Sequence, residues 1–335
     1  MVPALALLGP SFRAGQLPFV LLSALLPLIA YETSRLLAPS RRRAWLAGLL
    51  TLSAPFYVKY WVSTDNFTPF AVTGSLALLA LARGLDQARP AWLALAGGLI
   101  GLSHLARADA PLLFAVMALA GLWPGAGAPS WRERRRRLLV GFALAGLAYL
   151  AVMGPWFWRN LRLNGTLLGP AGLQTLFLRS YDDLFSYGRP LTLQSYLEWG
   201  WPAILRSKLD AAASNLTTVI VVLLSIFLAP LAGVELWARR RELLSRLTGL
   251  YLLLLYLSMT LLFTFPGPRG SLLHSGGALL PALTAFAAAG LERILAWAAR
   301  RRAGWDAQQA NRVFAGGLLA LSIGMGAFIL SLIHI

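Results

Sequence analysis

The chain contains no cysteine, only three histidines, and 13 acidic residues against 30 basic ones. The missing cysteines exclude disulfides, thiolate metal sites and cysteine nucleophiles, and they leave the redox compartment undecided. Charge is also scarce, because Asp, Glu, Lys and Arg together make up 13% of the chain, about half their share in soluble domains. A soluble globule with a polar surface is therefore excluded, and the bilayer is predicted to be the main solvent.

The chain is instead rich in apolar residues and in positive charge. Hydrophobic residues make up 58% of the 335 residues, and the mean hydropathy is +0.65. In a soluble protein the net charge of +17 would suggest a nucleic-acid partner. Here the excess lies in short loops between apolar segments, so anionic lipid headgroups, and not nucleic acid, are the expected partner.

Ten apolar segments are candidates for membrane-spanning helices. About 20 apolar residues cross the hydrocarbon core as a helix, and shorter stretches can lie in protein-lined surroundings. The segments are 17–38, 44–62, 67–83, 91–107, 110–124, 138–158, 216–237, 247–265, 272–297 and 313–333. We therefore expect an all-α integral membrane protein, with about ten transmembrane helices in one domain over residues 1–335 and one longer extracytoplasmic loop at about 159–214.

Arginine clusters occupy every second loop between these segments. With ten helices, 18 of the 30 lysines and arginines fall in those loops and ten on the opposite side. The clusters lie at 41–43, 83–89, 132–137, 239–246 and 300–312. The positive-inside rule makes this side cytoplasmic, and the preference for arginine over lysine looks bacterial. We expect a multi-pass protein of the plasma (inner) membrane with its site on the extracytoplasmic side.

Asp65 lies in the segment VSTDNFTPF, at the predicted outer mouth of two helices. A carboxylate there can stay hydrated while it faces a cavity, where it could bind a metal, position an acceptor hydroxyl or act as a base. The structural alternative is that Thr64 and Asp65 cap a helix that begins near Phe67. Both roles can hold together.

Arg107 and Asp109 lie in GLSHLARADAPLL, near the outer end of another helix. His104 and Arg107 are three residues apart, which would place them on one helical face. The planar fork of arginine donors suits a phosphate. The alternative is a local pair of Arg107 with Asp109 at a helix break before Pro111.

Arg159 and Asn160 follow the sixth predicted span, in GPWFWRNLRLNG. Pro155 and a run of aromatic residues are expected to end that helix. Arg159, Asn160 and Arg162 would then emerge outside and could cradle a pyrophosphate or a lipid phosphate. An interfacial aromatic belt with flanking cations explains the same residues without a ligand.

The long loop holds Asp182 and Asp183, the only adjacent carboxylates of the chain. They could coordinate a divalent cation through oxygen ligands, or they could form a solvated turn. A divalent cation is the one cofactor that the sequence suggests. Further along the loop, Trp199 and Trp201 suit a helix at the level of the headgroups.

Arg269 and His274 lie in FPGPRGSLLHSGGALLPAL, between the eighth and ninth spans. Glycine-rich backbone lets main-chain N–H groups approach an anion closely, and Arg269 would supply charge. His274 is expected to begin a helix that continues through Pro281, and it could point into a cavity. A lone histidine can equally have a purely structural role.

Taken together, these segments resemble the GT-C superfamily of multi-pass membrane glycosyltransferases, close to the bacterial relatives of protein O-mannosyltransferases and aminoarabinose transferases. The resemblance rests on YWVSTDNFTPF, RPAWLALAGGLIGLSHLARADAPLL, GPWFWRNLRLNG and PGPRGSLLHSGGALLPAL, which extend over most of residues 1–300. Hydropathy and segment order define the superfamily more than strict motifs do.

The resemblance implies transfer of a hexose or pentose from a polyprenyl-phosphate sugar to an acceptor glycan, lipid or protein on the outer side of the bilayer. Asp65 and Asp109 would be the catalytic carboxylates. The residues that would bind substrate are Arg107, Arg159, Asn160, Arg269 and His274.

One departure from the superfamily concerns the start of the chain. Members usually open with a transmembrane helix and an outer loop that bears an acidic catalytic residue. The segment MVPALALLGPSFRAGQLPFVLLSALLPLIAYETSRLL instead resembles the part that follows that loop. An internal start at Met1, with the main catalytic carboxylate outside the chain, is therefore an open alternative, and the apolar end at SLIHI leaves truncation open there too.

Two other classes of function suit the same topology. A transporter or flippase of lipid-linked intermediates could also use arginines at one mouth, but transporters commonly bind near the midplane and show repeats. A noncatalytic membrane subunit would follow if the catalytic loop were missing. The enzyme is favoured because the polar residues cluster at the outer ends of helices and no repeat is visible.

Overall fold

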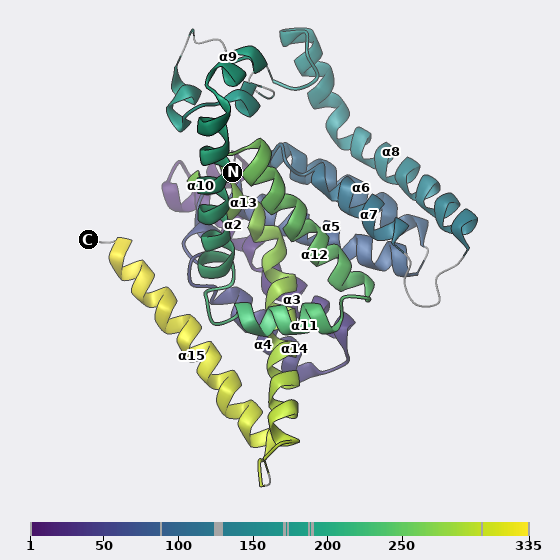
Figure 1. Ribbon diagram of the computed structural model, residues 1–335, viewed down its shortest axis with the longest axis vertical. Coiled ribbons are helices and arrows are strands. Elements are labelled where there is room, and N and C mark those ends of the chain that lie inside the picture. The colour runs from purple at the N-terminus through teal and green to yellow at the C-terminus, as the bar shows by residue number, and fades with distance from the viewer. Residues whose placement is uncertain are drawn as a thin grey trace.

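The computed structural model describes residues 2–87, 89–123, 130–169, 172, 174–186, 188, 191–302 and 304–333. Every regular element in these residues is a helix (Figure 1). Six helical stretches are long and apolar enough to cross a membrane: Phe12–Leu37, Phe67–Asp86, Trp131–Asn164, Leu243–Leu262, Gly267–Ala299 and Ala307–Leu332. The all-α class expected from the sequence is confirmed, with helices of the length that a multi-pass membrane protein needs.

The helices of the first half are α1 (Val2–Leu8), α2 (Phe12–Ser23), α3 (Leu25–Leu37), α4 (Arg41–Leu52), α5 (Phe67–Asp86), α6 (Pro90–Ala106), α7 (Leu112–Leu122) and α8 (Trp131–Asn164). Those of the second half are α9 (Leu193–Glu198), α10 (Trp201–Thr217), α11 (Ala229–Ala238), α12 (Leu243–Leu257), α13 (Leu272–Gly276), α14 (Leu280–Ala299) and α15 (Ala307–Ile333). Short π-helical segments extend α10 and α12 and precede α13.

Four of the ten expected spans are either shorter than a full membrane crossing or interrupted. Helices α6 and α7 are apolar but have only 17 and 11 residues. The segment 44–62 is not one helix, because Pro55 follows the end of α4 and disfavours continuation. The segment 216–237 breaks at Ser225 and Ile226, whose φ angles are 50° and 59°. The number of membrane crossings therefore stays a prediction.

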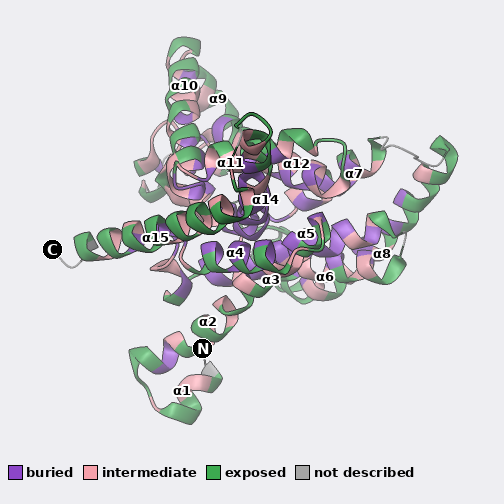
Figure 2. Ribbon diagram, turned by 90° about the horizontal axis from the view of Figure 1, so that it is seen from below, coloured by how far each residue is buried: buried purple, intermediate pink, exposed green. Residues whose placement is uncertain are grey.

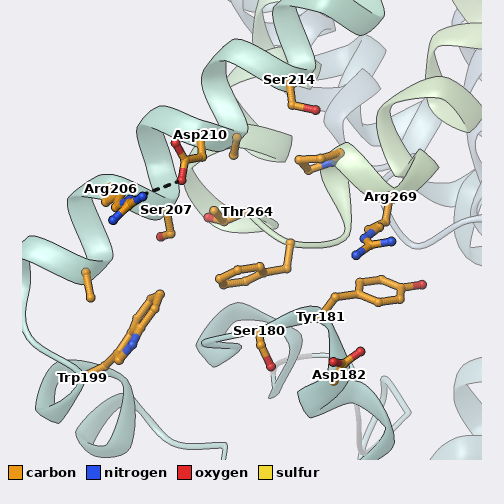
Figure 3. Close-up of a pocket in the computed structure, with 14 residues that line it drawn as sticks. Ser180, Tyr181, Asp182, Trp199, Arg206, Ser207, Asp210, Ser214, Thr264 and Arg269 are labelled. Atoms are coloured by element: carbon orange, nitrogen blue, oxygen red, sulfur yellow. Dashed lines mark ion pairs between the residues drawn. The ribbon is translucent and has the colours of Figure 1, made fainter.

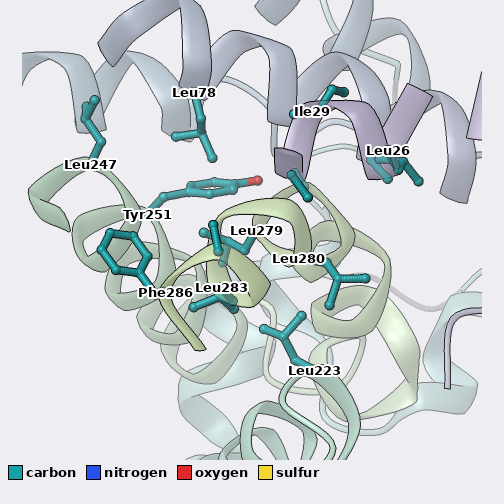
Figure 4. Close-up of a cluster of buried hydrophobic side chains, with 14 of the residues drawn as sticks. Leu26, Ile29, Leu78, Leu223, Leu247, Tyr251, Leu279, Leu280, Leu283 and Phe286 are labelled. Atoms are coloured by element: carbon teal, nitrogen blue, oxygen red, sulfur yellow. The ribbon is translucent and has the colours of Figure 1, made fainter. Parts of the chain in front are cut away.

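Helix α14 is the centre of the packed core. It packs against α3, α4 and α11, and residues 280–291 are all buried. Figure 4 shows Leu283 and Phe286 of α14 beside Tyr251 of α12, in a cluster that also includes Leu26 of α3. Small residues bring α11 close, since a Cβ at Gly290 would lie 2.0 Å from the Leu231 carbonyl oxygen.

Helices α5, α6 and α8 form a second layer, in which α6 packs between the other two. The contact between α6 and α8 depends on Gly97, where an added Cβ would lie 2.0 Å from the carbonyl oxygen of Ala145. The next residue, Gly98, faces open space, with nothing within 4 Å of an added Cβ. The two helix backbones therefore touch at Gly97.

Helix α8 runs past the point where the sequence was expected to end it. Pro155 lies inside the helix, which continues to Asn164 and ends at Gly165 with a φ of 69°. The expectation that Arg159 and Asn160 emerge into a loop is therefore wrong, since both lie in the last turns of α8. Membrane helices tolerate an internal proline because neighbouring groups satisfy the freed carbonyl.

Many large apolar side chains are exposed, and Figure 2 shows α15 as a largely exposed ribbon. In the apolar windows of α15 and α8, only 11% and 22% of residues are buried. Leu321, Ile323 and Phe328 of α15 are each at least half exposed. Such faces suit contact with lipid chains, which need no polar partner.

Ion pairs with one buried partner stabilise the arginine-rich end, where α4 and α11 each pack against α14 in the lower half of Figure 1. Glu235 of α11 is 1% exposed and accepts hydrogen bonds from Arg239 and Arg293. Arg43 of α4, itself buried, pairs with Glu292 of α14 at 2.9 Å. Some arginines counted for topology therefore have a structural role as well.

Candidate active site

Three segments that are far apart in the sequence meet near α13, which lies in the upper half of Figure 1. They are residues 63–66 before α5, 107–109 between α6 and α7, and 271–275 around α13. Side-chain hydrogen bonds connect them across 168 and 208 residues of chain. We call this set of segments the polar cluster.

Arg107 is the centre of the polar cluster. Its Nε lies 2.9 Å from Oγ of Ser275 and 3.3 Å from Oδ1 of Asp109, and Nη2 donates to the carbonyl of Ser271 at 3.3 Å. The Ser275 hydroxyl also donates to Oδ2 of Asp109. The side chains of Arg107 and Asp109 are only 14% and 7% exposed. The expected local pair is thus confirmed, and a nearly buried carboxylate holds the guanidinium in one orientation.

His274 joins the same cluster through Asn66. Its Nδ1 lies 2.9 Å from Oδ1 of Asn66, and its ring stacks on Phe67 with 3.4 Å between centroids. An amide oxygen only accepts, so Nδ1 carries the hydrogen and the neutral ring keeps a lone pair on Nε2. Asn66 also donates to the carbonyl of Ala106 at 3.3 Å, which fixes the end of α6 beside α13.

Asp65 caps α5 and remains exposed. Its Oδ1 accepts from the backbone N–H of Phe67 at 2.8 Å, and its Oδ2 accepts from Ser63 Oγ at 2.9 Å. The capping alternative therefore holds for Asp65 but not for Thr64, and α5 begins at Phe67 as expected, with Asn66 as the N-cap residue. Each carboxylate oxygen has a second lone pair, so capping leaves Asp65 able to accept a further proton or hydrogen bond.

His104 does not share a face with Arg107, contrary to expectation. Helix α6 ends at Ala106, and Arg107 is extended with φ −151° and ψ 137°. The ring of His104 instead points to α8, where its Nδ1 lies 2.6 Å from the hydroxyl of Tyr149. His104 therefore belongs to the packing between α6 and α8.

A turn at Gly270 shapes the approach to His274. Gly270 has a φ of +112°, which favours glycine, and an added Cβ would lie 3.7 Å from Cδ2 of His274. Gly267 lies against the carbonyl of Met259, with only 2.5 Å between that oxygen and an added Cβ. These two glycines let the segment before α13 fold tightly beside the polar cluster.

Other predicted residues lie elsewhere or have local partners. Asn160 is buried and donates to the carbonyl of Leu167 at 3.1 Å, and Arg159 is exposed, with its guanidinium 5.3 Å from the ring of Trp156. Asp183 is buried, and its Oδ2 accepts from the backbone N–H of Arg179 and Ser180. The hydrogen bonds and ring contacts of Arg159 and Asn160 do not connect them to the polar cluster within the described residues.

Arg269 and Asp182 line a cavity of about 560 Å³ next to the polar cluster. The guanidinium of Arg269 lies 5.3 Å from the ring centroid of Tyr181. Across the described residues, no three His, Cys, Asp or Glu side chains come close enough to hold a metal ion. The expected loop at 159–214 contains α9 and α10, and its residues 170, 171, 173, 187, 189 and 190 lie outside the described part.

Asn66 and Ser275 are cluster residues that the sequence did not single out. Asn66 is adjacent to Asp65, and Ser275 is adjacent to His274, so both were near the predicted positions. Their partners, however, lie more than 160 residues away along the chain. A single sequence contains no signal for such pairings.

One protein family matches the first part of the chain. Residues 3–158 match the family described as dolichyl-phosphate-mannose-protein mannosyltransferase. This segment contains Asp65, Arg107 and Asp109. No curated protein sequence matches the chain significantly.

Two solved structures share the fold across nearly the whole chain. ArnT from Cupriavidus metallidurans bound to undecaprenyl phosphate aligns with a TM-score of 0.56 and 18% identity, over 97% of this chain and 59% of ArnT. The apo state of the same protein aligns with a TM-score of 0.54 and 18% identity, over the same shares. The chain thus spans 59% of the length of the solved structure it matches. The shared fold confirms the multi-pass membrane architecture, and the family match agrees with the expected resemblance over residues 3–158.

Proposed function

We propose that this chain transfers a sugar from a polyprenyl-phosphate donor to an acceptor on the extracytoplasmic side of a bacterial inner membrane. The observation that carries the proposal is the meeting of three distant segments, in which Arg107 contacts Ser275 and His274 contacts Asn66, the neighbour of Asp65. The matched family, and a shared fold with an ArnT bound to undecaprenyl phosphate, support it.

Arg107 is the group we assign to the donor phosphate. Its Nε and Nη2 are used by Asp109, Ser275 and Ser271, whereas its Nη1 makes no hydrogen bond to any other described residue. The guanidinium therefore has donors left for a phosphate oxygen. Asp109 then orients Arg107, which differs from the catalytic role expected from the resemblance.

Asp65 is the group we assign to the acceptor. The acceptor hydroxyl gives its proton to the Asp65 carboxylate, and its oxygen lone pair bonds to the anomeric carbon of the donor sugar. The bond from that carbon to the phosphate oxygen breaks, and polyprenyl phosphate leaves with the electron pair. Arg107 stabilises the charge that develops on this phosphate. Nε2 of His274 is free to accept a hydrogen bond from a substrate hydroxyl.

Transfer with labelled donors tests the proposal. Membranes that contain the full-length protein are incubated with polyprenyl-phosphate mannose or polyprenyl-phosphate aminoarabinose, one a hexose donor and the other a pentose donor, and with a glycan, lipid or protein acceptor fraction. We expect label to move from the lipid to one acceptor fraction. Movement of labelled lipid across the bilayer, without transfer from either donor, would support a flippase and contradict the enzyme.

A further inference from the structure

The cavity beside the polar cluster has the size of a ligand site. Its volume of about 560 Å³ falls within the range of about 300–1,000 Å³ that small-molecule sites occupy. Figure 3 shows its walls, which are α10, residues 180–182, Trp199, residues 264–265 and residues 268–269. We call it the α10 pocket.

Small residues on one face of α10 create the space. The lining positions Ala203, Ser207, Ala211 and Ser214 recur every three or four residues, so they share a helical face. Arg206 and Asp210 belong to the same wall, but their side chains are 86% and 75% exposed and lie 3.9 Å apart. Small side chains therefore line the inner part of this wall, and charged side chains lie at the opening of the pocket.

Three aromatic rings line the pocket. The rings of Trp199 and Phe265 lie 6.1 Å apart at 48°, and the third ring, Tyr181, carries Arg269 on its face. The face of an aromatic ring is electronegative. The C–H bonds on one side of a pyranose are weakly positive, so a sugar ring can stack on such a face while its hydroxyls point to polar neighbours.

The charges of the pocket balance. Its ionisable lining residues are Arg206, Arg269, Asp182 and Asp210, which sum to a net charge of zero. A phosphate or carboxylate ligand would meet two carboxylates as well as two guanidiniums. A neutral polyhydroxyl ligand is better matched, since carboxylates accept from hydroxyls while guanidiniums and serines donate to them.

The wall formed by α10 is fixed in place. Lys208 donates from Nζ to Thr264 Oγ1, and Nζ lies 5.5 Å from the ring centroid of Tyr196. Burial lowers the pKa of Lys208 and raises that of Tyr196. Because Thr264 also lines the pocket, this contact joins its two walls before any ligand arrives.

The α10 pocket and the polar cluster lie on either side of one turn. Pro268 and Arg269 line the pocket, whereas Ser271 and Ser275 contact Arg107. Gly270, between them, lies against the ring of His274. A molecule in the pocket is therefore adjacent to the site assigned to the donor phosphate.

We propose that the α10 pocket binds a neutral sugar unit of the acceptor, stacked on Trp199, so that the acceptor of this protein is a glycan or a glycosylated molecule. The assignment of this sugar to the acceptor rests on the proposed function. Binding of a sugar in the pocket does not rest on the proposed function, because the pocket is formed by residues outside the polar cluster.

Direct binding tests the pocket. Purified full-length protein in nanodiscs is titrated with the neutral disaccharides maltose, cellobiose, lactose and mannobiose, and with inorganic pyrophosphate, by saturation-transfer NMR. We expect at least one disaccharide to bind, with about tenfold weaker binding in Trp199→Ala. Trp201→Ala is the matched control, since Trp201 is 73% exposed and does not line the pocket. Ser207→Phe fills the pocket while it keeps every aromatic wall, and it should abolish binding.

Three results would overturn the pocket assignment: no binding of any disaccharide, equal binding by Trp199→Ala and the wild type, or binding of pyrophosphate alone. Kinetics then separate the pocket from the reaction. In a transferring preparation, Trp199→Ala should raise the KM for acceptor about tenfold and leave the KM for donor unchanged. Disaccharide binding that depends on Trp199, in a protein without any transfer activity, would uphold the pocket and reject the proposed function.

Discussion

The side chains of Asn66 and His274 lie 2.9 Å apart, from Oδ1 to Nδ1, although 208 residues separate them in the sequence. This contact joins the start of α5 to α13, while Arg107 and Ser275 join the end of α6 to the same helix. The proposed reaction depends on these two bridges, because they bring Asp65 and Arg107 to one site.

Loss of the Arg107 side chain should weaken binding of the donor lipid. We expect Arg107→Ala to reduce the affinity for undecaprenyl phosphate by about 10- to 100-fold, the usual effect of losing hydrogen bonds to a charged group. Arg107→Lys keeps the positive charge beside Asp109 but lacks the planar fork of donors, so it should lose less affinity for undecaprenyl phosphate than Arg107→Ala does. Binding is measured by tryptophan quenching in nanodiscs.

Arg240→Ala is the control, because Arg240 is exposed and stacks on Trp237 at the arginine-rich end. An equal loss in both alanine variants would reject the phosphate assignment.

Asp65→Asn separates catalysis from capping. The amide oxygen can still accept from the N–H of Phe67, so the fold should survive, but the base is lost. We expect transfer to fall about 100-fold or more, with undecaprenyl phosphate still bound. Asp306→Asn removes a charge from a similar cap, since Asp306 Oδ1 accepts from the N–H groups of Gln308 and Gln309. Its transfer rate should equal that of the wild type, and comparable activity in Asp65→Asn would remove Asp65 from the mechanism.

Asn66 and His274 should act as a unit. We expect Asn66→Ala and His274→Ala each to lower the transfer rate, and the double variant to lose less than the product of the two separate effects. A coupling of about 0.5–3 kcal/mol is typical of residues in direct contact. Strictly multiplicative losses in the double-mutant cycle would mean that the 2.9 Å contact has no role in the reaction.

Gly97→Ala should destabilise the membrane bundle. The added methyl group would lie 2.0 Å from the carbonyl oxygen of Ala145, so α6 and α8 must separate. Overpacking of this kind costs about 1–3 kcal/mol. Gly98→Ala meets nothing within 4 Å, and alanine favours a helix over glycine by about 1 kcal/mol. Thermal melting in detergent should therefore show a lower Tm for Gly97→Ala only, and equal melting of the two variants would contradict the close crossing.

Glu235→Gln should lower the free energy of unfolding by about 3 kcal/mol, because it leaves two arginines without their buried partner. Glu242 offers the comparison, since it pairs with Arg239 at 3.0 Å but its side chain is 50% exposed. Glu242→Gln should change the free energy of unfolding by about 1 kcal/mol or less. Unfolding by SDS titration measures both. Similar losses would show that burial of Glu235 does not strengthen its ion pairs.

Local features of the site were readable from the sequence. The cap at Asp65 and the pair of Arg107 with Asp109 each lie within two or three residues, where short-range rules apply. The contacts of Ser275 and Asn66 were not readable, because packing of distant helices creates them. Pro155 was misread, since a proline that ends a soluble helix is tolerated in an apolar one. The helix breaks near Pro55 and Ser225 could not be read from the sequence, because they lie inside apolar segments long enough to span a membrane.

Photo-crosslinking tests the central claim most directly, which is that the polar cluster holds the donor phosphate. The full-length protein is irradiated with an undecaprenyl phosphate analogue that carries a diazirine on the isoprene unit next to the phosphate, and the adducts are mapped by mass spectrometry. We expect adducts within residues 60–70, 104–112 and 268–278, and their loss in Arg107→Ala but not in Arg240→Ala. Adducts confined to α15 or to the arginine-rich loops, or unchanged labelling in Arg107→Ala, would contradict the claim.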